Sequence, residues 1–92
     1  MPFIRVTLAT GFDQEEDEQV LIDGLNTILM EELAKGLDTI MIQIDAYKRL
    51  YLGGELLEKG AMVELQAYRK NTAQQHKQVH DRIVTLLGQT LS

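Results

Sequence analysis

Residues 1–8 have the sequence MPFIRVTL, in which a proline is followed at once by alternating apolar side chains. Side chains of an extended chain point to opposite sides in turn, so Ile4, Val6 and Leu8 fall on one side. This alternation predicts a strand over residues 3–9 with one face against an apolar core.

After the first strand, the spacing of the apolar residues changes from every second residue to every third or fourth residue, as in a helix. Apolar residues at helical spacing predict an amphipathic helix over 14–34, with Asp13 as its N-cap, Glu16 completing a capping box and Gly36 at its end. A second alternating strand is predicted over 39–45. A strand, a helical crossover and a second strand predict a right-handed parallel unit.

The second half of the chain echoes the first. Gly53-Gly54 predicts a tight turn or short hairpin, a third strand follows over 62–68, and Asn71 is expected to cap a second helix over 72–91. This strand and helix repeat the first pair at a displacement of roughly sixty residues. The sequence therefore predicts a single α/β (α+β) domain over residues 1–92, arranged β-α-β and then β-α, with both helices on one face of the sheet.

One side of each predicted element is apolar and is expected to form the core. The expected core residues are Ile4, Val6, Leu8, Leu21, Leu25, Ile28, Leu29, Leu33, Ile40, Ile42, Ile44, Val63, Leu65, Ala67, Val79, Ile83, Leu86, Leu87 and Leu91. The other face of the sheet mixes apolar and charged side chains, among them Phe3, Arg5, Met41 and Glu64. Such a mixture suits a subunit interface better than water, so we expect a homo-oligomer.

The composition narrows the classes of partner. The 92 residues carry a net charge of −5 and no cysteine, and 45% of them are hydrophobic. An acidic chain does not favour nucleic acid or an anionic membrane, because both require a basic surface. The sequence shows no signal-peptide pattern and no apolar run long enough for a membrane span. The absence of cysteine fits a reducing compartment, so we expect a cytoplasmic protein.

Pro2 is the residue with the most distinctive chemistry. If Met1 is removed, Pro2 presents a free secondary amine, which can act as a general base or a nucleophile when burial disfavours its charged form. If Met1 is retained, the Pro2 nitrogen is an amide and cannot act as a base. Alternatively, Pro2 only begins an edge strand, where its missing N–H costs nothing.

Several motifs together give the chain a family resemblance. The Met-Pro-aromatic-Ile start, the acid-rich loop before a long helix, the isoleucine-rich second strand and the sequence from Leu52 to Leu56, LGGEL, resemble the tautomerase superfamily. Residues 2–58 are most similar to 4-oxalocrotonate tautomerase, and the rest is similar to longer two-repeat members. The resemblance implies an amino-terminal proline base, an active site between subunits of a trimer or hexamer, small enol or keto acid substrates, and no metal or organic cofactor.

The sequence departs from the family pattern at the substrate-binding arginines. Phe12 follows the first-strand glycine where the family has an arginine, Met41 lies near the place of the second arginine, and Leu50 replaces an aromatic residue. Those arginines bind the substrate carboxylate and polarise its carbonyl, which suits a planar bidentate donor.

Other residues could take over these roles. We expect Arg49 and Tyr51, in the loop before the double glycine, and Arg69, after the third strand, to bind substrate. Arg5 is a further candidate, although an ion pair with Glu64 or Asp45 on the outward sheet face accounts for it equally simply.

The remaining motifs suggest no other chemistry. His76 and His80 have the i, i+4 spacing of a metal pair, but no third ligand accompanies them, so a solvated helix flank is the preferred interpretation. Two alternatives to a tautomerase stay open. One is a catalytically silent relative that serves as an oligomeric or ligand-binding module. The other is a ferredoxin-like regulatory domain, in which Pro2 is incidental.

Overall fold

The computed structural model of the chain describes residues 2–67 and 72–91. Its elements are, in chain order, β1 (Phe3–Leu8), α1 (Glu15–Leu33), a short 3-10 helix η1 (Leu37–Thr39), β2 (Met41–Asp45), β3 (Tyr51–Leu52), β4 (Glu55–Leu56), β5 (Ala61–Gln66) and α2 (Ala73–Leu91). The predicted order β-α-β followed by β-α is confirmed, with a hairpin between the two units.

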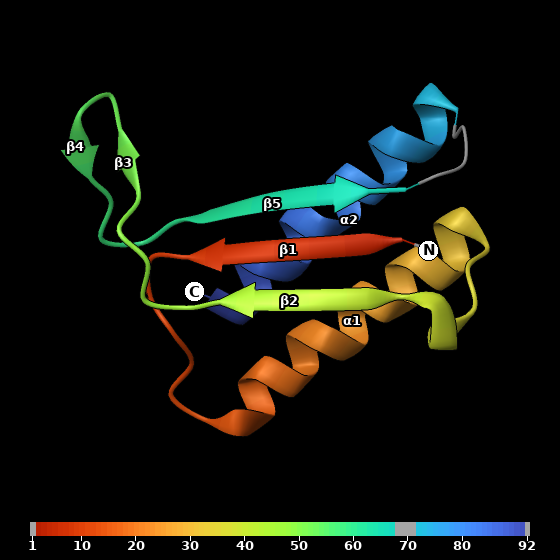
Figure 1. Cartoon of the computed structure of the whole chain (residues 1–92), viewed down its shortest axis with the longest axis horizontal. Helices are drawn as coiled ribbons and strands as arrows, with labels where there is room; N and C mark the ends of the chain where they lie inside the picture. The colour runs from red at the N-terminus through yellow and green to blue at the C-terminus, as the bar shows by residue number, and fades with distance from the viewer. Residues whose placement is uncertain (1, 68–71, 92) are drawn as a thin grey trace.

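β1 is the central strand of a three-stranded sheet with the order β2-β1-β5. It runs parallel to β2, with Ile4 beside Ile42, and antiparallel to β5, with Ile4 beside Leu65. Both helices lie on one face of this sheet and leave the other face open (Figure 1). The structure thus confirms the predicted fold class and the parallel first unit.

The core lies between the sheet and the two helices. Its fully or nearly buried residues are Ile4, Val6, Leu8, Leu21, Leu25, Ile28, Leu29, Leu33, Val79 and Ile83, and the expected residues Ile40, Ile42, Ile44, Val63, Leu65, Leu86 and Leu87 pack against them half-buried. The side chain of Leu91 lies outside the described part of the structure. In the described ranges, neither helix combines the length and the apolar character that a membrane crossing requires.

The ends of α1 differ from the prediction. Gln14, not Asp13, is the N-cap, and no side chain caps the helix there. The acidic residues Glu15–Glu18 of the first turn complement the helix dipole instead. At the other end, Ala34 adopts the left-handed conformation (φ 53°) and donates its N–H to the carbonyl of Leu29. Gly36 has an ordinary extended conformation and begins η1, so it is not the C-cap.

The strand of the second unit also begins and ends differently from the prediction, whereas α2 ends at Leu91 as predicted. β5 covers Ala61–Gln66 and not residues 62–68, and Asn71, expected as the cap of α2, lies outside the described residues. Thr72 and Gln75 form the capping box of α2: the Gln75 N–H donates to the Thr72 hydroxyl at 3.0 Å, and the Thr72 N–H donates to the Gln75 side-chain oxygen at 2.8 Å.

The hairpin of β3 and β4 projects from the end of the sheet at which β1 and β2 finish (Figure 1). Its two turn residues, Gly53 (φ 61°) and Gly54 (φ 84°), both have positive φ, which a type I′ hairpin turn requires and which glycine adopts without strain. The predicted turn is confirmed. The hairpin holds apolar side chains in solvent: Tyr51 is 59% exposed and Leu52 is 72% exposed.

Candidate functional site

Pro2 occupies a buried position at the first end of the central strand. Less than 2% of its surface is exposed. Its carbonyl oxygen accepts a hydrogen bond from the N–H of Met41 at 3.0 Å, which ties the residue to the start of β2. The parallel pairing of β1 and β2 therefore fixes Pro2 at one end of the sheet.

Arg49 and Tyr51 lie at the opposite end of the sheet. β1 leads away from Pro2, and because β2 runs parallel to it, the segment that follows β2 begins beyond the far end of β1 (Figure 1). A six-residue strand such as β1 spans about 20 Å. Within one chain, Arg49 and Tyr51 therefore do not lie next to Pro2. Arg69 lies outside the described residues.

At the end of the sheet with Arg49, backbone hydrogen bonds join the segment after β2 to the end of β1, which the sequence did not suggest. Tyr47 donates its N–H to Thr10 at 3.1 Å, and Lys48 donates its N–H to Leu8 at 2.9 Å. Tyr47 has a left-handed backbone conformation (φ 59°), which is uncommon for a bulky residue. Its ring lies against Gly11, where a side chain would meet it.

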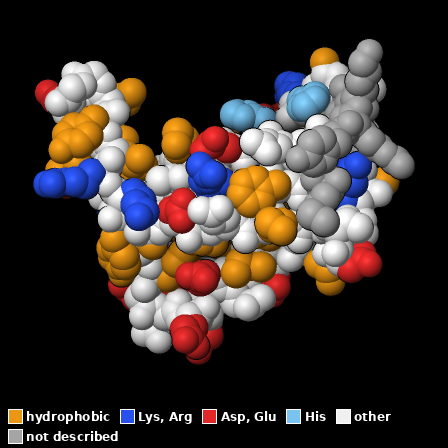
Figure 2. All heavy atoms as spheres, in the orientation of Figure 1, with side chains coloured by type: hydrophobic (Ala, Val, Ile, Leu, Met, Phe, Trp, Pro, Cys, Tyr) orange, Lys and Arg blue, Asp and Glu red, His pale blue; other side chains and the backbone are white. Residues whose placement is uncertain are grey.

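These contacts lie at the carboxyl ends of two parallel strands, the usual place for ligand sites in such sheets. They hold the short basic segment Lys48-Arg49 in place, and Figure 2 shows basic side chains gathered near the hairpin. Tyr47 was not among the expected site residues. The only signal for its position was the glycine at position 11, which leaves room for an aromatic ring.

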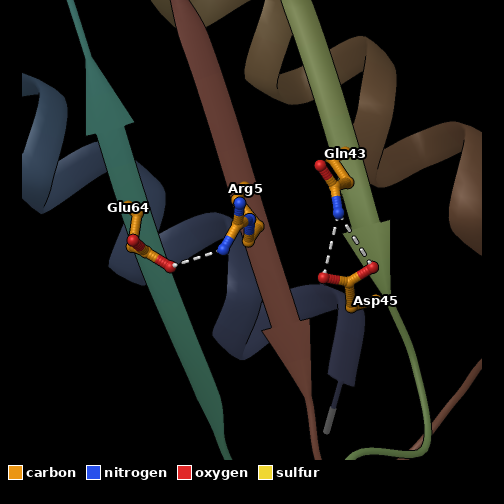
Figure 3. Close-up of polar contacts among 4 residues, drawn as sticks. All are labelled: Arg5, Gln43, Asp45 and Glu64. Carbon is orange, nitrogen blue, oxygen red and sulfur yellow. Dashed lines mark hydrogen bonds and ion pairs between the residues drawn. The ribbon is translucent and has the colours of Figure 1, made fainter.

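The open face of the sheet carries two separate pairs of polar side chains (Figure 3). The guanidinium of Arg5 lies 3.6 Å from the carboxylate of Glu64, and the Gln43 amide donates to both carboxylate oxygens of Asp45 at 3.2 Å. The ion pair that served as the simple interpretation of Arg5 is therefore present, with Glu64 as the partner. The Nε of Arg5 is buried without a hydrogen-bond partner among the described residues.

His76 and His80 lie on α2, in the first half of the helix. Across residues 2–67 and 72–91, no group of three or more histidine, aspartate or glutamate side chains is placed to hold a metal ion. The pair lines a groove beside β5 together with apolar side chains.

Solved structures show where this fold is found elsewhere. MIF2 of Leishmania major superposes with a TM-score of 0.85 at 20% identity, over 98% of this chain and 76% of that one. Pt0534, in a structure inactivated by 2-oxo-3-pentynoate, superposes with a TM-score of 0.83 at 11% identity, over 96% and 72%. A fused 4-OT, solved as an asymmetric trimer, gives a TM-score of 0.78 at 18% identity, over 97% and 74%.

Sequence comparison adds nothing to this likeness, since no protein-family model matches the chain and no curated protein is similar to it in sequence. At such low identities, the superpositions establish the fold and not the chemistry. They cover nearly the whole chain, including both strand-helix units, and favour the resemblance over a ferredoxin-like domain. The chain has the fold of the tautomerase superfamily, to which these solved structures belong.

Proposed function

We propose that this protein is a cofactor-independent tautomerase of small enol or keto acids, in which Pro2 is the general base. The observation that carries the proposal is the position of Pro2: it is buried at the start of the central strand of a tautomerase fold. Burial disfavours the charged form of an amine, so a Pro2 nitrogen freed by removal of Met1 would favour its neutral form, which can accept a proton.

The reaction requires only proton transfers. The Pro2 nitrogen takes the proton from the hydroxyl of an enol, and the electron pair of that O–H bond forms the carbonyl as the double bond moves. The protonated proline then delivers a proton to the neighbouring carbon, which gives the keto form and regenerates the base. A cation that binds the substrate carboxylate would hold the reacting carbon close to the nitrogen.

Arg49 and Tyr51 fit this binding role only if they come from a neighbouring subunit. Pro2 and Arg49 lie at opposite ends of each sheet, so a head-to-tail arrangement would bring the Pro2 end of one copy to the Arg49 end of the next. Head-to-tail contacts generate closed rings when the rotation closes. We therefore propose a homotrimer, with a hexamer as the second choice, and the trimeric fused 4-OT supports this assembly. The proposed compartment is the cytoplasm, in keeping with the cysteine-free sequence.

The first experiment determines the state of the amino terminus and the reactivity of Pro2. Intact-mass spectrometry of native protein should show that Met1 is absent. Incubation with 2-oxo-3-pentynoate, an electrophilic keto acid, should then place a covalent adduct on Pro2 in the peptide map, because a neutral secondary amine adds to a conjugated alkyne. Pro2→Ala should abolish both the adduct and the turnover of phenylenolpyruvate. Retained Met1 would refute proline catalysis.

The second experiment tests whether two subunits share the site. Pro2→Ala and Arg49→Ala should each be inactive alone. Mixing the two variants under conditions that exchange subunits should restore part of the activity, because some sites then combine an intact Pro2 with an intact Arg49. A mixture that stays inactive although it contains mixed oligomers would place Arg49 outside the site.

A catalytically silent relative is the second candidate. The observation in its favour is that the arginines with described side chains are engaged or distant: Arg5 pairs with Glu64, Arg82 pairs with Glu31 at 2.8 Å, and Arg49 lies at the far end of the sheet. This candidate predicts an assembled oligomer without Met1 that neither reacts with 2-oxo-3-pentynoate nor turns over phenylenolpyruvate.

A further inference from the structure

The segment that follows β2 turns back toward β1 at Tyr47. In the parallel ladder of β1 and β2, the numbers of paired residues rise together along both strands. Beyond the ladder this order is reversed. The Tyr47 N–H donates to the Thr10 carbonyl at 3.1 Å. The Lys48 N–H donates to an earlier carbonyl, that of Leu8, at 2.9 Å. The chain therefore changes direction at Tyr47, where the backbone is left-handed (φ 59°).

Tyr47 is an unexpected residue for this turn. A left-handed conformation costs a residue that has a Cβ atom, whereas glycine adopts it freely. Such conformations persist only where the surrounding structure holds them, and they gather at functional sites. The Tyr47 side chain is 74% exposed, so burial in the core does not account for an aromatic residue here.

Gly11 provides the place for the Tyr47 ring. The ring lies directly against this glycine, and a Cβ atom at position 11 would overlap it. Gly11 does not need its conformational freedom, because the glycines with positive φ in the described part of the chain are Gly53 and Gly54. What position 11 requires is space. The ring on Gly11 therefore holds the turn after β2 against the loop after β1.

Arg49 lies between two neighbours whose backbones are anchored. On one side, the Lys48 N–H is bonded to Leu8. On the other side, the Leu50 carbonyl accepts a hydrogen bond of 2.8 Å from the Leu57 N–H at the base of the hairpin. The ion pairs among the described residues include neither Lys48 nor Arg49. An exposed guanidinium on a fixed backbone loses less freedom when it binds an anion than one on a mobile loop does.

We propose that Tyr47 is a positioning residue: its left-handed backbone and its ring on Gly11 fix Arg49 for binding a substrate carboxylate. This inference rests on the proposed function, in which Arg49 binds the carboxylate of a substrate that reacts at the Pro2 of a neighbouring subunit. A carboxylate is the fitting ligand, because a guanidinium forms two parallel hydrogen bonds with it. Tyr47 acts through Arg49 and takes no part in the proton transfers.

The test follows the side-chain Nε–H signal of Arg49 by NMR while phenylpyruvate is added to the whole 92-residue protein. Phenylacetone, a neutral ketone without the carboxylate, is the control ligand. Phenylpyruvate should shift the Arg49 signal, and phenylacetone should not. A shift without turnover of phenylenolpyruvate would refute the proposed activity and support the binding role of Arg49. An unshifted Arg49 signal would overturn this inference, even in a protein that turns over phenylenolpyruvate.

Two substitutions remove the contact between the ring and the glycine. Gly11→Ala displaces the ring, and Tyr47→Gly deletes it. Each should weaken phenylpyruvate binding by about tenfold, because a displaced guanidinium loses a hydrogen bond to a charged group. Each should also speed hydrogen exchange of the Lys48 amide. Tyr47→Phe keeps the ring and should restore tight binding. Gly88→Ala is the matched control, since this exposed glycine of α2 has open space around it.

The double variant tests whether both residues act through one contact. Once Tyr47→Gly has removed the ring, Gly11→Ala has nothing to displace, so the double variant should bind phenylpyruvate as Tyr47→Gly does. Additive losses would overturn the proposal.

Two further results would also overturn it. One is unchanged phenylpyruvate affinity and Lys48 exchange in both single variants. The other is a change in oligomer mass with unchanged affinity, which would assign the ring to a subunit interface. Circular dichroism checks that the variants fold. If Gly11→Ala does not fold, Tyr47→Gly, which relieves a left-handed residue in an exposed loop, still decides the question.

Discussion

Arg5 and Glu64 lie directly opposite each other on β1 and β5, and the guanidinium is 3.6 Å from the carboxylate. The two side chains are 43% and 46% exposed in the single chain. They lie on the open face of the sheet (Figure 3), and exposed apolar residues such as Met62 alternate along β5 with the same register. The charged pair and the apolar side chains therefore lie on the same face of the sheet. A subunit that packed against this face would bury the pair together with the apolar side chains.

This relationship gives a prediction about stability in dilute solution. Arg5→Gln and Glu64→Gln should each lower the free energy of unfolding by less than about 1 kcal/mol, because a half-exposed ion pair is screened by solvent. Urea denaturation of both single variants and the double variant would give the coupling free energy. A coupling well above that range at low protein concentration would contradict this prediction, whereas a coupling that rises with protein concentration would show that a neighbouring subunit desolvates the pair.

A substitution in the centre of the core should lower the free energy of unfolding much more than a substitution in the Arg5–Glu64 pair. Leu25 of α1 is fully buried, so Leu25→Ala should lower the free energy of unfolding by about 2 to 5 kcal/mol through lost burial and the cavity left behind. The control is Val20→Ala on the same helix, which should change it by less than about 0.5 kcal/mol because Val20 is exposed. Urea denaturation would measure both, and similar losses for the two variants would contradict the placement of the core.

The end of α1 predicts a stabilising substitution. Ala34 has φ 53°, a conformation that costs an alanine but not a glycine. Ala34→Gly should therefore raise the free energy of unfolding by about 1 kcal/mol, and thermal unfolding followed by circular dichroism would detect it. Exposed Ala73, in the first turn of α2, provides the control, because Ala73→Gly should not stabilise the protein. A loss of stability in Ala34→Gly would show that α1 ends elsewhere.

An ion pair on the exposed face of α2 should shift the pKa of the Asp81 carboxyl. The Lys77 ammonium donates a hydrogen bond of 2.8 Å to Asp81, and this bond lowers the pKa of the Asp81 carboxyl from its ordinary value of 3.8, with a smaller contribution from the charge of Lys77. The same hydrogen bond raises the pKa of Lys77. Because the folded pKa of Asp81 is lowered, its contribution to stability is present above pH 3.8 and is lost as the pH falls through the folded value.

Carbon-13 NMR of the Asp81 carboxyl during a pH titration would measure this shift. Lys77→Met should bring the pKa of Asp81 back toward its ordinary value, because it removes the hydrogen-bond donor. An unchanged Asp81 titration in Lys77→Met would show that the ion pair does not persist in solution.

The strands, the helices and their inward faces could be predicted from local patterns of residues. The alternation of Ile4, Val6 and Leu8 and the helical spacing of Leu21 and Leu25 are local consequences of backbone geometry, so they could be recognised without knowledge of the partners. The Gly53-Gly54 turn was equally local, because positive φ at two successive residues is a property of the residues themselves.

The helix ends were harder to predict because several residues compete for each cap. Asp13 and Gly36 were suitable by type, yet Gln14 and Ala34 occupy the positions at which the chain enters and leaves α1. Those positions depend on how far the buried stripe of α1 extends over the sheet. Packing against the sheet therefore set the end of α1, although this places Ala34, and not a glycine, in the left-handed conformation.

The positions of the candidate residues relative to one another follow from the way in which the strands pair. The sequence identified Pro2, Arg49 and Tyr51 as residues with suitable chemistry, but their spacing along the chain does not give their distance in space. The parallel pairing of β1 and β2 places Pro2 at one end of the sheet and sends the segment after β2 to the other. The groove beside β5 likewise forms only where α2 packs beside that strand, and no single stretch of sequence contains this arrangement.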